Sequence, residues 1–242
     1  MAISDRFAAA LSQAAEAGPT GPELLPVRLS RAVASALGVD AAGLGMVDAL
    51  GRWLPLGASA DAASTAERVQ FTAGEGPCRT ARSTGQPVLA VEEELRRRWP
   101  AFTERLLAVT PYRAVIALPL GPAPWGQGAL DLYLRSGARV AEVDAFAATA
   151  VGELVSAALS DATVWATWPP GEDPAWLRGP VTRDRTRVWE AMGRVCMDLD
   201  VPTEEALALL RSAASAAGRT VDDVAADVLA GRRVAADLRA AG

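Results

Sequence analysis

Hydrophobic residues in the first 165 positions follow helical spacing in some stretches and strand-like alternation in others. The predicted helices cover residues 2–17, 23 or 25–37, 61–69, a short stretch ending at 83, 93–109 and 140–165. The predicted strands cover residues 41–47, 54–58, 87–91, 113–120 and 129–134, with longer loops at 71–78 and 121–128. An antiparallel sheet with helices at both ends of the region is typical of an α+β domain.

The last quarter of the chain has helical periodicity alone. One predicted helix there has a hydrophobic face, which we expect to be core, formed by Val188, Met192, Val195 and Leu199. Its opposite face is basic, with Arg183, Arg187 and Arg194 about one or two turns apart. Two more helical patterns follow, in residues 204–211 and 220–225.

A proline-rich stretch separates the two regions. Residues 166–182 contain four prolines and two glycines, so we expect a linker without regular structure. The domains are therefore expected at 1–165, with an N-terminal helix and a long C-terminal helix, and at 183–242. Trp165, Trp168 and Trp176 are unusual in a free linker, so this segment is expected to pack on a domain or on a partner subunit.

Composition excludes several classes of chemistry. The chain has no His and two Cys, which removes a His general base and a structural zinc site. Cys78 and Cys196 lie in different predicted domains, so a disulfide is not expected. A net charge of −5 gives no whole-chain attraction to nucleic acid. We expect no catalytic residues, no metal and no cofactor.

The N-terminus lacks the charged-then-apolar layout of a signal peptide, and no apolar run approaches the length of a membrane span. The expected location is therefore the cytoplasm, without membrane contact.

Five separated motifs of the first region follow one another in a fixed order. They are Gly74-Glu75-Gly76-Pro77-Cys78, Gly85-Gln86-Pro87-Val88, Arg98-Trp99-Pro100-Ala101-Phe102, Ala117-Leu118-Pro119-Leu120 and Gly128-Ala129-Leu130-Asp131-Leu132-Tyr133. In this order, residues 24–162 resemble the GAF domains found in actinobacterial regulators. The resemblance implies a GAF-like antiparallel sheet flanked by helices. It also implies a candidate sensor pocket for an unidentified small molecule, at Gly74, Gly76 and Cys78.

The three helical patterns of the last quarter resemble the ANTAR domain, a small all-α three-helix module. Its Ala-Lys-Gly signature appears here as Ala191-Met192-Gly193. The resemblance implies an RNA-binding bundle that acts in transcription antitermination on RNA stem-loops. Guanidinium groups contact phosphates and stack on unpaired bases, which suits an RNA loop. The candidate RNA-binding residues are Arg187, Ala191, Gly193, Arg194, Arg211 and Arg219.

Three residues depart from this second family pattern. Met192 replaces the usual Lys, Asp200 stands where Gly is usual, and Pro202 stands where a Ser cap is frequent. Thr203 is expected to take over the capping role. The segment Thr220–Asp223 predicts a capping box for the third helix.

Several alternatives stay open. The bundle binds either RNA or, in a degenerate regulator, a protein partner. Cys78 is either a redox thiol or a small buried side chain, and methionine sulfoxide reduction is rejected because no resolving thiol accompanies it. Gly193 serves either close helix packing or close approach of an RNA backbone. Helix 140–165 packs on its own sheet or on a second subunit, and a homodimer is expected, through Ala147, Val151, Leu154 and Ala158.

Overall fold

A five-stranded antiparallel sheet forms the centre of the N-terminal region. The computed structural model describes residues 1–16, 20–123, 126–164 and 174–239. The strands are β1 (Ala41–Val47), β2 (Trp53–Ala58), β3 (Val88–Val91), β4 (Ala114–Ala123) and β5 (Gly126–Leu134). Their order is β2-β1-β5-β4-β3, and every neighbouring pair is antiparallel. The sheet and its flanking helices confirm the expected mixed α and β architecture.

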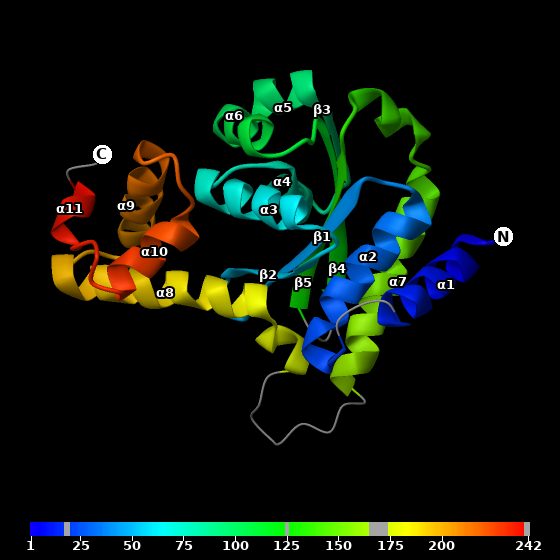
Figure 1. The fold of residues 1–242 in the computed structure, drawn as a ribbon, viewed down its shortest axis with the longest axis horizontal. Helices are drawn as coiled ribbons and strands as arrows, with labels where there is room; N and C mark the ends of the chain where they lie inside the picture. Colours follow the sequence, from blue (N-terminus) through cyan, green and yellow to red (C-terminus); the bar gives the residue numbers. More distant parts are fainter. Residues whose placement is uncertain (17–19, 124–125, 165–173, 240–242) are drawn as a thin grey trace.

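Helices cover both faces of the sheet (Figure 1). One face carries α1 (Ile3–Glu16), α2 (Leu25–Leu37) and α7 (Ala145–Val164), and the other carries α3 (Asp61–Ala73), α4 (Pro77–Thr84), α5 (Glu92–Arg98) and α6 (Pro100–Val109). Alternation along β5 serves both layers: Leu130 and Leu132 face the first, whereas Asp131 and Tyr133 face the second. Asp131 is thus a buried carboxylate in the second layer, next to the buried Gln70.

Three expected boundaries of the N-terminal region are wrong. The single helix 93–109 is two helices, because Trp99 precedes Pro100 and leaves the helical conformation (φ −138°, ψ 69°). The loop 121–128 is shorter than expected, since β4 continues to Ala123 and β5 begins at Gly126. The loop 71–78 is also shorter, because α3 ends at Ala73 and Gly74 takes the left-handed C-cap conformation.

The C-terminal bundle consists of α8 (Pro180–Leu199), α9 (Thr203–Ala216), α10 (Val221–Leu229) and the short α11 (Ala236–Arg239). Of the expected core face of α8, Val188 and Val195 are fully buried, and Met192 and Leu199 are half-buried. A helical bundle thus follows the sheet, with one short helix more than the three expected.

Of the two helix caps predicted in the bundle, one is present and one is not. The capping box of Thr220 and Asp223 is present. Thr203 does not cap α9: Pro202 is its N-cap residue, without a side-chain hydrogen bond. Asp200 ends α8 in the left-handed conformation (φ 53°), which a short polar side chain tolerates better than most and which also favours Gly.

The expectation of a linker without regular structure is wrong for its second half. Ala175–Arg178 form a 3-10 turn, and α8 begins at Pro180 instead of residue 183. Proline suits the first position of a helix, because its missing N–H has no partner there. Trp176 is buried, as expected for an indole in this stretch, whereas Trp165 and Trp168 lie outside the described residues.

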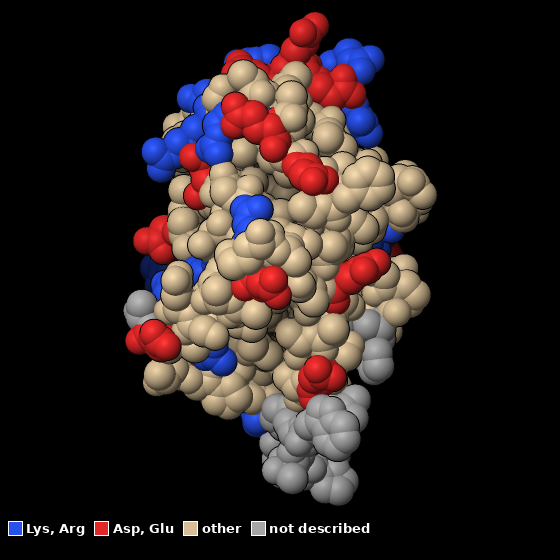
Figure 2. Space-filling model, turned by 90° about the vertical axis from the view of Figure 1, so that its right-hand side faces the viewer, with Lys and Arg blue, Asp and Glu red and all other residues tan. Residues whose placement is uncertain are grey.

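Helix α7 buries one side against β4, α1 and α2. Val151 is fully buried there, whereas Ala147, Leu154 and Ala158 are half-buried. By length and composition alone, Ala145–Thr163 is apolar enough to cross a membrane, although Glu153 and Asp161 interrupt it, and 28% of it is buried in the protein. The side of the molecule that carries α1 and α7 is mostly uncharged between scattered charged residues (Figure 2). The homodimer stays a prediction.

Candidate functional site: the seam between sheet and bundle

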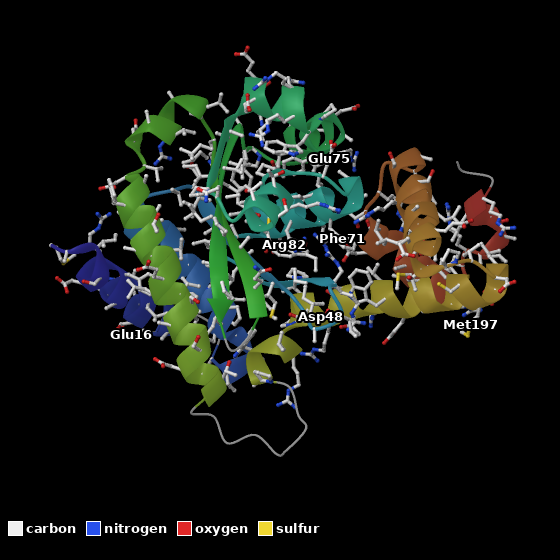
Figure 3. The ribbon with its side chains drawn as sticks, turned by 180° about the vertical axis from the view of Figure 1, so that it is seen from behind. Glu16, Asp48, Phe71, Glu75, Arg82 and Met197 are labelled. Atoms are coloured by element: carbon white, nitrogen blue, oxygen red, sulfur yellow. The ribbon has the colours of Figure 1, made fainter. Side chains whose placement is uncertain are left out.

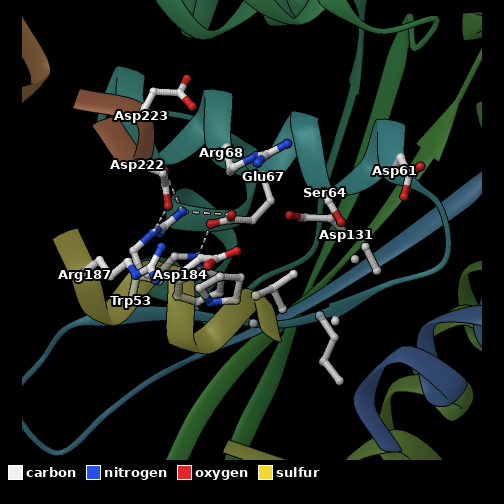
Figure 4. Close-up of a pocket in the computed structure, with 18 of the residues that line it drawn as sticks. Trp53, Asp61, Ser64, Glu67, Arg68, Asp131, Asp184, Arg187, Asp222 and Asp223 are labelled. Carbon is white, nitrogen blue, oxygen red and sulfur yellow. Dashed lines mark hydrogen bonds and ion pairs between the residues drawn. The ribbon is translucent and has the colours of Figure 1, made fainter. Parts of the chain in front are cut away.

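The C-terminal bundle packs against the N-terminal region along a seam formed by β2, α3 and α4 on one side and α8, α9 and α10 on the other. At its centre lies Arg185, whose side chain is fully buried. Its Nε lies 3.0 Å from Asp222 Oδ1 of α10, and its Nη2 lies 3.0 Å from Glu67 Oε2 of α3 (Figure 4). The guanidinium carbon also sits 3.6 Å from the centre of the Phe71 ring. One buried cation therefore joins the bundle to the sheet layer.

Arg185, Glu67 and Asp222 form a triad with one positive and two negative charges, and this imbalance affects the pKa values of its members. Burial opposes the charge on Arg185, but Glu67 and Asp222 outweigh it and raise the pKa of the guanidinium. Burial also raises the pKa of Glu67, and the attraction of Arg185 offsets this only in part. A raised pKa is expected for both Arg185 and Glu67, because one buried cation is shared between two carboxylates. Glu67 also accepts a hydrogen bond of 3.0 Å from Trp53 Nε1.

An acid-lined cavity of about 420 Å³ opens beside the triad. Its walls come from β1, β2, β5, α3, α8 and α10, and its carboxylates are Asp61, Glu67, Asp131, Asp184, Asp222 and Asp223 (Figure 4). Three arginines, Arg68, Arg185 and Arg187, also line it. Gly45 is required in this wall, because a Cβ there would lie 2.2 Å from Cζ2 of Trp53. Trp53 can thus lie close against β1 and reach Glu67.

Asp131 is the most perturbed carboxylate of the cavity. It is 4% exposed, and its Oδ2 accepts hydrogen bonds from Gln70 Nε2 at 3.4 Å and from the Tyr133 hydroxyl at 3.5 Å. Burial raises the pKa of Asp131 to about 7, with Glu67 adding to the rise. Its Oδ1 and the Nη1 of Arg185 are buried and have no partner among the described residues. Both residues line the cavity, so a small polar ligand bound there would lie close to these two unpaired groups.

An arginine groove of about 660 Å³ runs along the seam on the side of Phe71, lined by Arg52, Arg79, Arg82 and Arg211 among others. Of the predicted sensor pocket, Gly74 and Cys78 line this groove, whereas Gly76 does not. Cys78 is 3% exposed, and burial raises the pKa of its thiol well above the usual value. Cys78 is therefore a buried side chain in this structure, without the lowered pKa of a redox thiol.

The structure disperses the candidate RNA-binding residues over several surfaces. Arg187 and Arg194 are exposed on α8, but Arg187 also lines the acid-lined cavity, and Arg194 pairs with Asp198 at 3.5 Å. The other four candidates lie elsewhere. Ala191 is fully buried, Gly193 is half-buried, Arg211 lies in the arginine groove and Arg219 pairs with Asp227 at 2.5 Å. Only part of this set is thus free to meet RNA on one face.

Gly193 does not serve close helix packing, because an added Cβ meets nothing within 4 Å. Since Gly in a helix interior costs about 0.5–1 kcal/mol relative to Ala, Gly193→Ala should raise the free energy of unfolding by that amount. Urea denaturation of the two proteins measures the change. Gly45→Ala serves as the matched control and should destabilise instead, because its Cβ meets Trp53. A loss of stability in Gly193→Ala would contradict the open position.

The sequence does not identify Arg185, Asp131 or Glu67 as site residues, although its pattern indicates that the first two are buried. Arg185 lies three residues before Val188, so helical spacing places it on the same buried face. Strand alternation likewise places Asp131 on the face of Tyr133. Glu67 had no such signal, because its role depends on Arg185, 118 residues away.

Among the described residues, no group of three His, Cys, Asp or Glu could hold a metal ion.

Comparisons with known proteins do not identify the function of the seam. No protein-family model matches the chain, and no curated protein matches it.

Two solved structures show a similarity in shape. The GAF domain of a phosphoenolpyruvate-protein phosphotransferase from Coxiella burnetii is 15% identical and gives a TM-score of 0.45, over 66% of this chain and 94% of that one. The phytochrome photosensory core module of Stigmatella aurantiaca is 16% identical with a TM-score of 0.41, over 85% of this chain and 42% of that one. Similarity at this level assigns neither a family nor an activity to the chain.

Proposed function

We propose that the chain is a signal-responsive regulator. Its GAF-like N-terminal region senses a small molecule, and its ANTAR-like C-terminal bundle is an output that binds RNA stem-loops in transcription antitermination. The observation that supports this proposal best is the buried Arg185, which pairs with Glu67 of the N-terminal region and Asp222 of the bundle. The same three residues line the acid-lined cavity. A ligand there would touch the contact that holds the bundle in place.

The cavity supports sensing because its polar groups are incompletely paired. A charged ligand bound next to Arg185 Nη1 changes the charge balance of the triad. Such a ligand shifts bundle docking only as far as it binds the docked and undocked states with different affinity. A buried guanidinium between two carboxylates is sensitive to such changes, because each charge depends on its partners in a medium of low dielectric constant.

The exposed arginines of α8 support RNA binding. Arg183, Arg187 and Arg194 are four and seven residues apart and can meet phosphates along a stem, with Arg187 also lining the acid-lined cavity. Arg211 does not extend this set, because its Nε donates to the Phe71 carbonyl at 3.1 Å inside the seam. RNA affinity would thus rest mainly on α8.

Arg187→Ala and Arg194→Ala should each weaken binding to RNA hairpins and make its salt dependence shallower. A lost phosphate contact reduces the slope of log affinity against log salt by about 0.7–1. The measurement is fluorescence anisotropy of a hairpin pool with the full chain, between about 50 and 200 mM salt. Arg31→Ala is the matched control, since Arg31 is exposed on α2, and it should leave the slope unchanged.

A second candidate function is docking of a protein partner on the bundle. Met197 on α8 is 80% exposed and points away from the seam (Figure 3), and Val234 is 63% exposed. The ion pairs of Arg194 with Asp198 and of Arg219 with Asp227 also neutralise two of the candidate RNA-binding arginines. If no hairpin in the pool binds, RNA binding is overturned and this second candidate replaces it.

A further inference from the structure

Three of the four arginines that line the arginine groove, Arg79, Arg82 and Arg211, have no carboxylate partner among the described residues. Arg79 donates to the Gly74 carbonyl at 3.2 Å, and a Cβ on Gly74 would lie 3.2 Å from Nη1 of Arg211. Arg79 from α4 and Arg211 from α9 thus meet at Gly74, one from each side of the seam. Neither residue nor Arg82 makes an ion pair with any residue that the structure describes.

The acidic residues near the groove have other partners. Glu75 caps α6, where its Oε1 accepts hydrogen bonds from the backbone N–H groups of Ala101 at 2.9 Å and Phe102 at 3.2 Å. Asp48 pairs with the fourth arginine of the groove, Arg52, at 2.7 Å. Glu204, the remaining carboxylate of the lining, is exposed at its edge. The groove therefore keeps an excess of positive charge.

Buried donors in the groove also lack acceptors. Trp189 is 9% exposed, and its Nε1 is buried without a hydrogen-bond partner among the described residues. The Nε of Arg82 is in the same condition, and both residues line the groove, as does Phe71 (Figure 3 labels Arg82 and Phe71). An unsatisfied buried donor is unfavourable, so a ligand that supplies acceptors would gain from each one.

Electrostatics at Arg211 favour a bound anion. Burial, together with the nearby charges of Arg79 and Arg185, lowers the pKa of Arg211 to about 10. A bound anion would reverse this by supplying opposite charge between Arg79 and Arg211. The first turn of α4, which includes Cys78 and Arg79, also lines the groove, and the N-terminus of a helix favours negative charge.

We propose that the arginine groove binds a phosphate-bearing small molecule across the seam. Phosphate oxygens accept from several guanidinium forks at once, which carboxylates of this chain do not do here. The volume of about 660 Å³ leaves room for more than one phosphate group, beside the Phe71 and Trp189 rings. Because Arg79 and Arg211 belong to opposite sides, the bound ligand ties the bundle to the N-terminal region. This inference does not depend on RNA binding.

Pyrophosphate titrated into the full chain in a calorimeter tests the proposal. Binding is expected, and Arg79→Gln and Arg211→Gln should each weaken it roughly 10- to 100-fold, as for a lost charge-assisted hydrogen bond. Arg31→Gln, an exposed arginine remote from the seam, should leave it unchanged. Arg79 is itself exposed, so its variant is expected to fold, and a thermal unfolding curve checks this. Pyrophosphate should also raise the wild-type Tm.

Three other results would overturn the proposal. The first is no heat of binding with pyrophosphate or inorganic phosphate. The second is equal affinity for malonate, a dianion without phosphorus, which would make the groove a general anion site. In the third, an RNA hairpin displaces pyrophosphate and Arg79→Gln weakens hairpin binding, which would make RNA the source of the phosphate. Hairpin binding on its own, without displacement, leaves pyrophosphate affinity intact and supports the small molecule.

Discussion

Replacing Arg185 by Met should lower the free energy of unfolding by about 3–5 kcal/mol, since a buried ion pair is broken from one side only. Met keeps much of the apolar volume but leaves Glu67 and Asp222 buried without their cation. It also removes the guanidinium that stacks on the Phe71 ring. Guanidinium chloride denaturation of the full chain, followed by circular dichroism, measures the loss.

Two further variants separate charge from packing. Arg183→Met changes an exposed arginine on the same helix and should shift stability by less than about 0.5 kcal/mol. Adding Glu67→Gln and Asp222→Asn to Arg185→Met should recover much of the loss, because neutral side chains cost less to bury than unpaired carboxylates. A loss below about 1 kcal/mol in Arg185→Met alone would mean that the triad does not hold the seam together.

Asp131→Asn should remove a large pH dependence of stability. In the folded chain burial raises the pKa of Asp131 from 3.8 to about 7, so between these values the folded state holds a proton that the unfolded state has lost. The contribution of Asp131 is thus complete below about pH 4 and is lost as the pH rises to about 7. The wild-type loss is on the order of 4 kcal/mol, from a shift of about three pKa units.

The comparison of the two proteins across pH cancels the titrating groups that do not interact with Asp131. Between about pH 4 and pH 8, the stability of Asp131→Asn relative to wild type should rise by that amount. Asp61→Asn is the control, because Asp61 lines the same cavity but is exposed, and it should follow the wild-type curve. Parallel curves for wild type and Asp131→Asn would show that the Asp131 carboxyl is ionised throughout.

Local patterns account for most of the fold and for little of the seam. Strand alternation predicts both faces of β5, and the 3–4 spacing of hydrophobic residues predicts the buried face of α8. The same spacing places Arg185 on this buried face, but the sequence does not indicate which acidic residues pair with it. Gly193 shows a similar limit, since only the structure reveals the open space beside it.

The contacts of the seam join residues that the chain keeps far apart. Arg211 and the Phe71 carbonyl are 140 residues apart, and Thr182 and the Pro55 carbonyl are 127 residues apart. No periodicity reports such pairings, because they depend on how the bundle is placed on the sheet layer. Arg211 is an example. The sequence assigns it to an RNA-binding surface, whereas the structure places it in the arginine groove at the seam.

The placement of α8 has a mechanical consequence. This helix of 20 residues is attached to the sheet layer near its start, by Thr182 and Arg185, so it acts as a lever with its pivot at that end. Met197 lies about 18 Å along the axis from Arg185, so a tilt of about 10° displaces it by roughly 3 Å. Arg211 braces the lever farther out, through Phe71. A small tilt of α8 at Thr182 and Arg185 would thus become a larger displacement at Met197. A molecule bound next to Arg211 in the arginine groove would restrain that tilt.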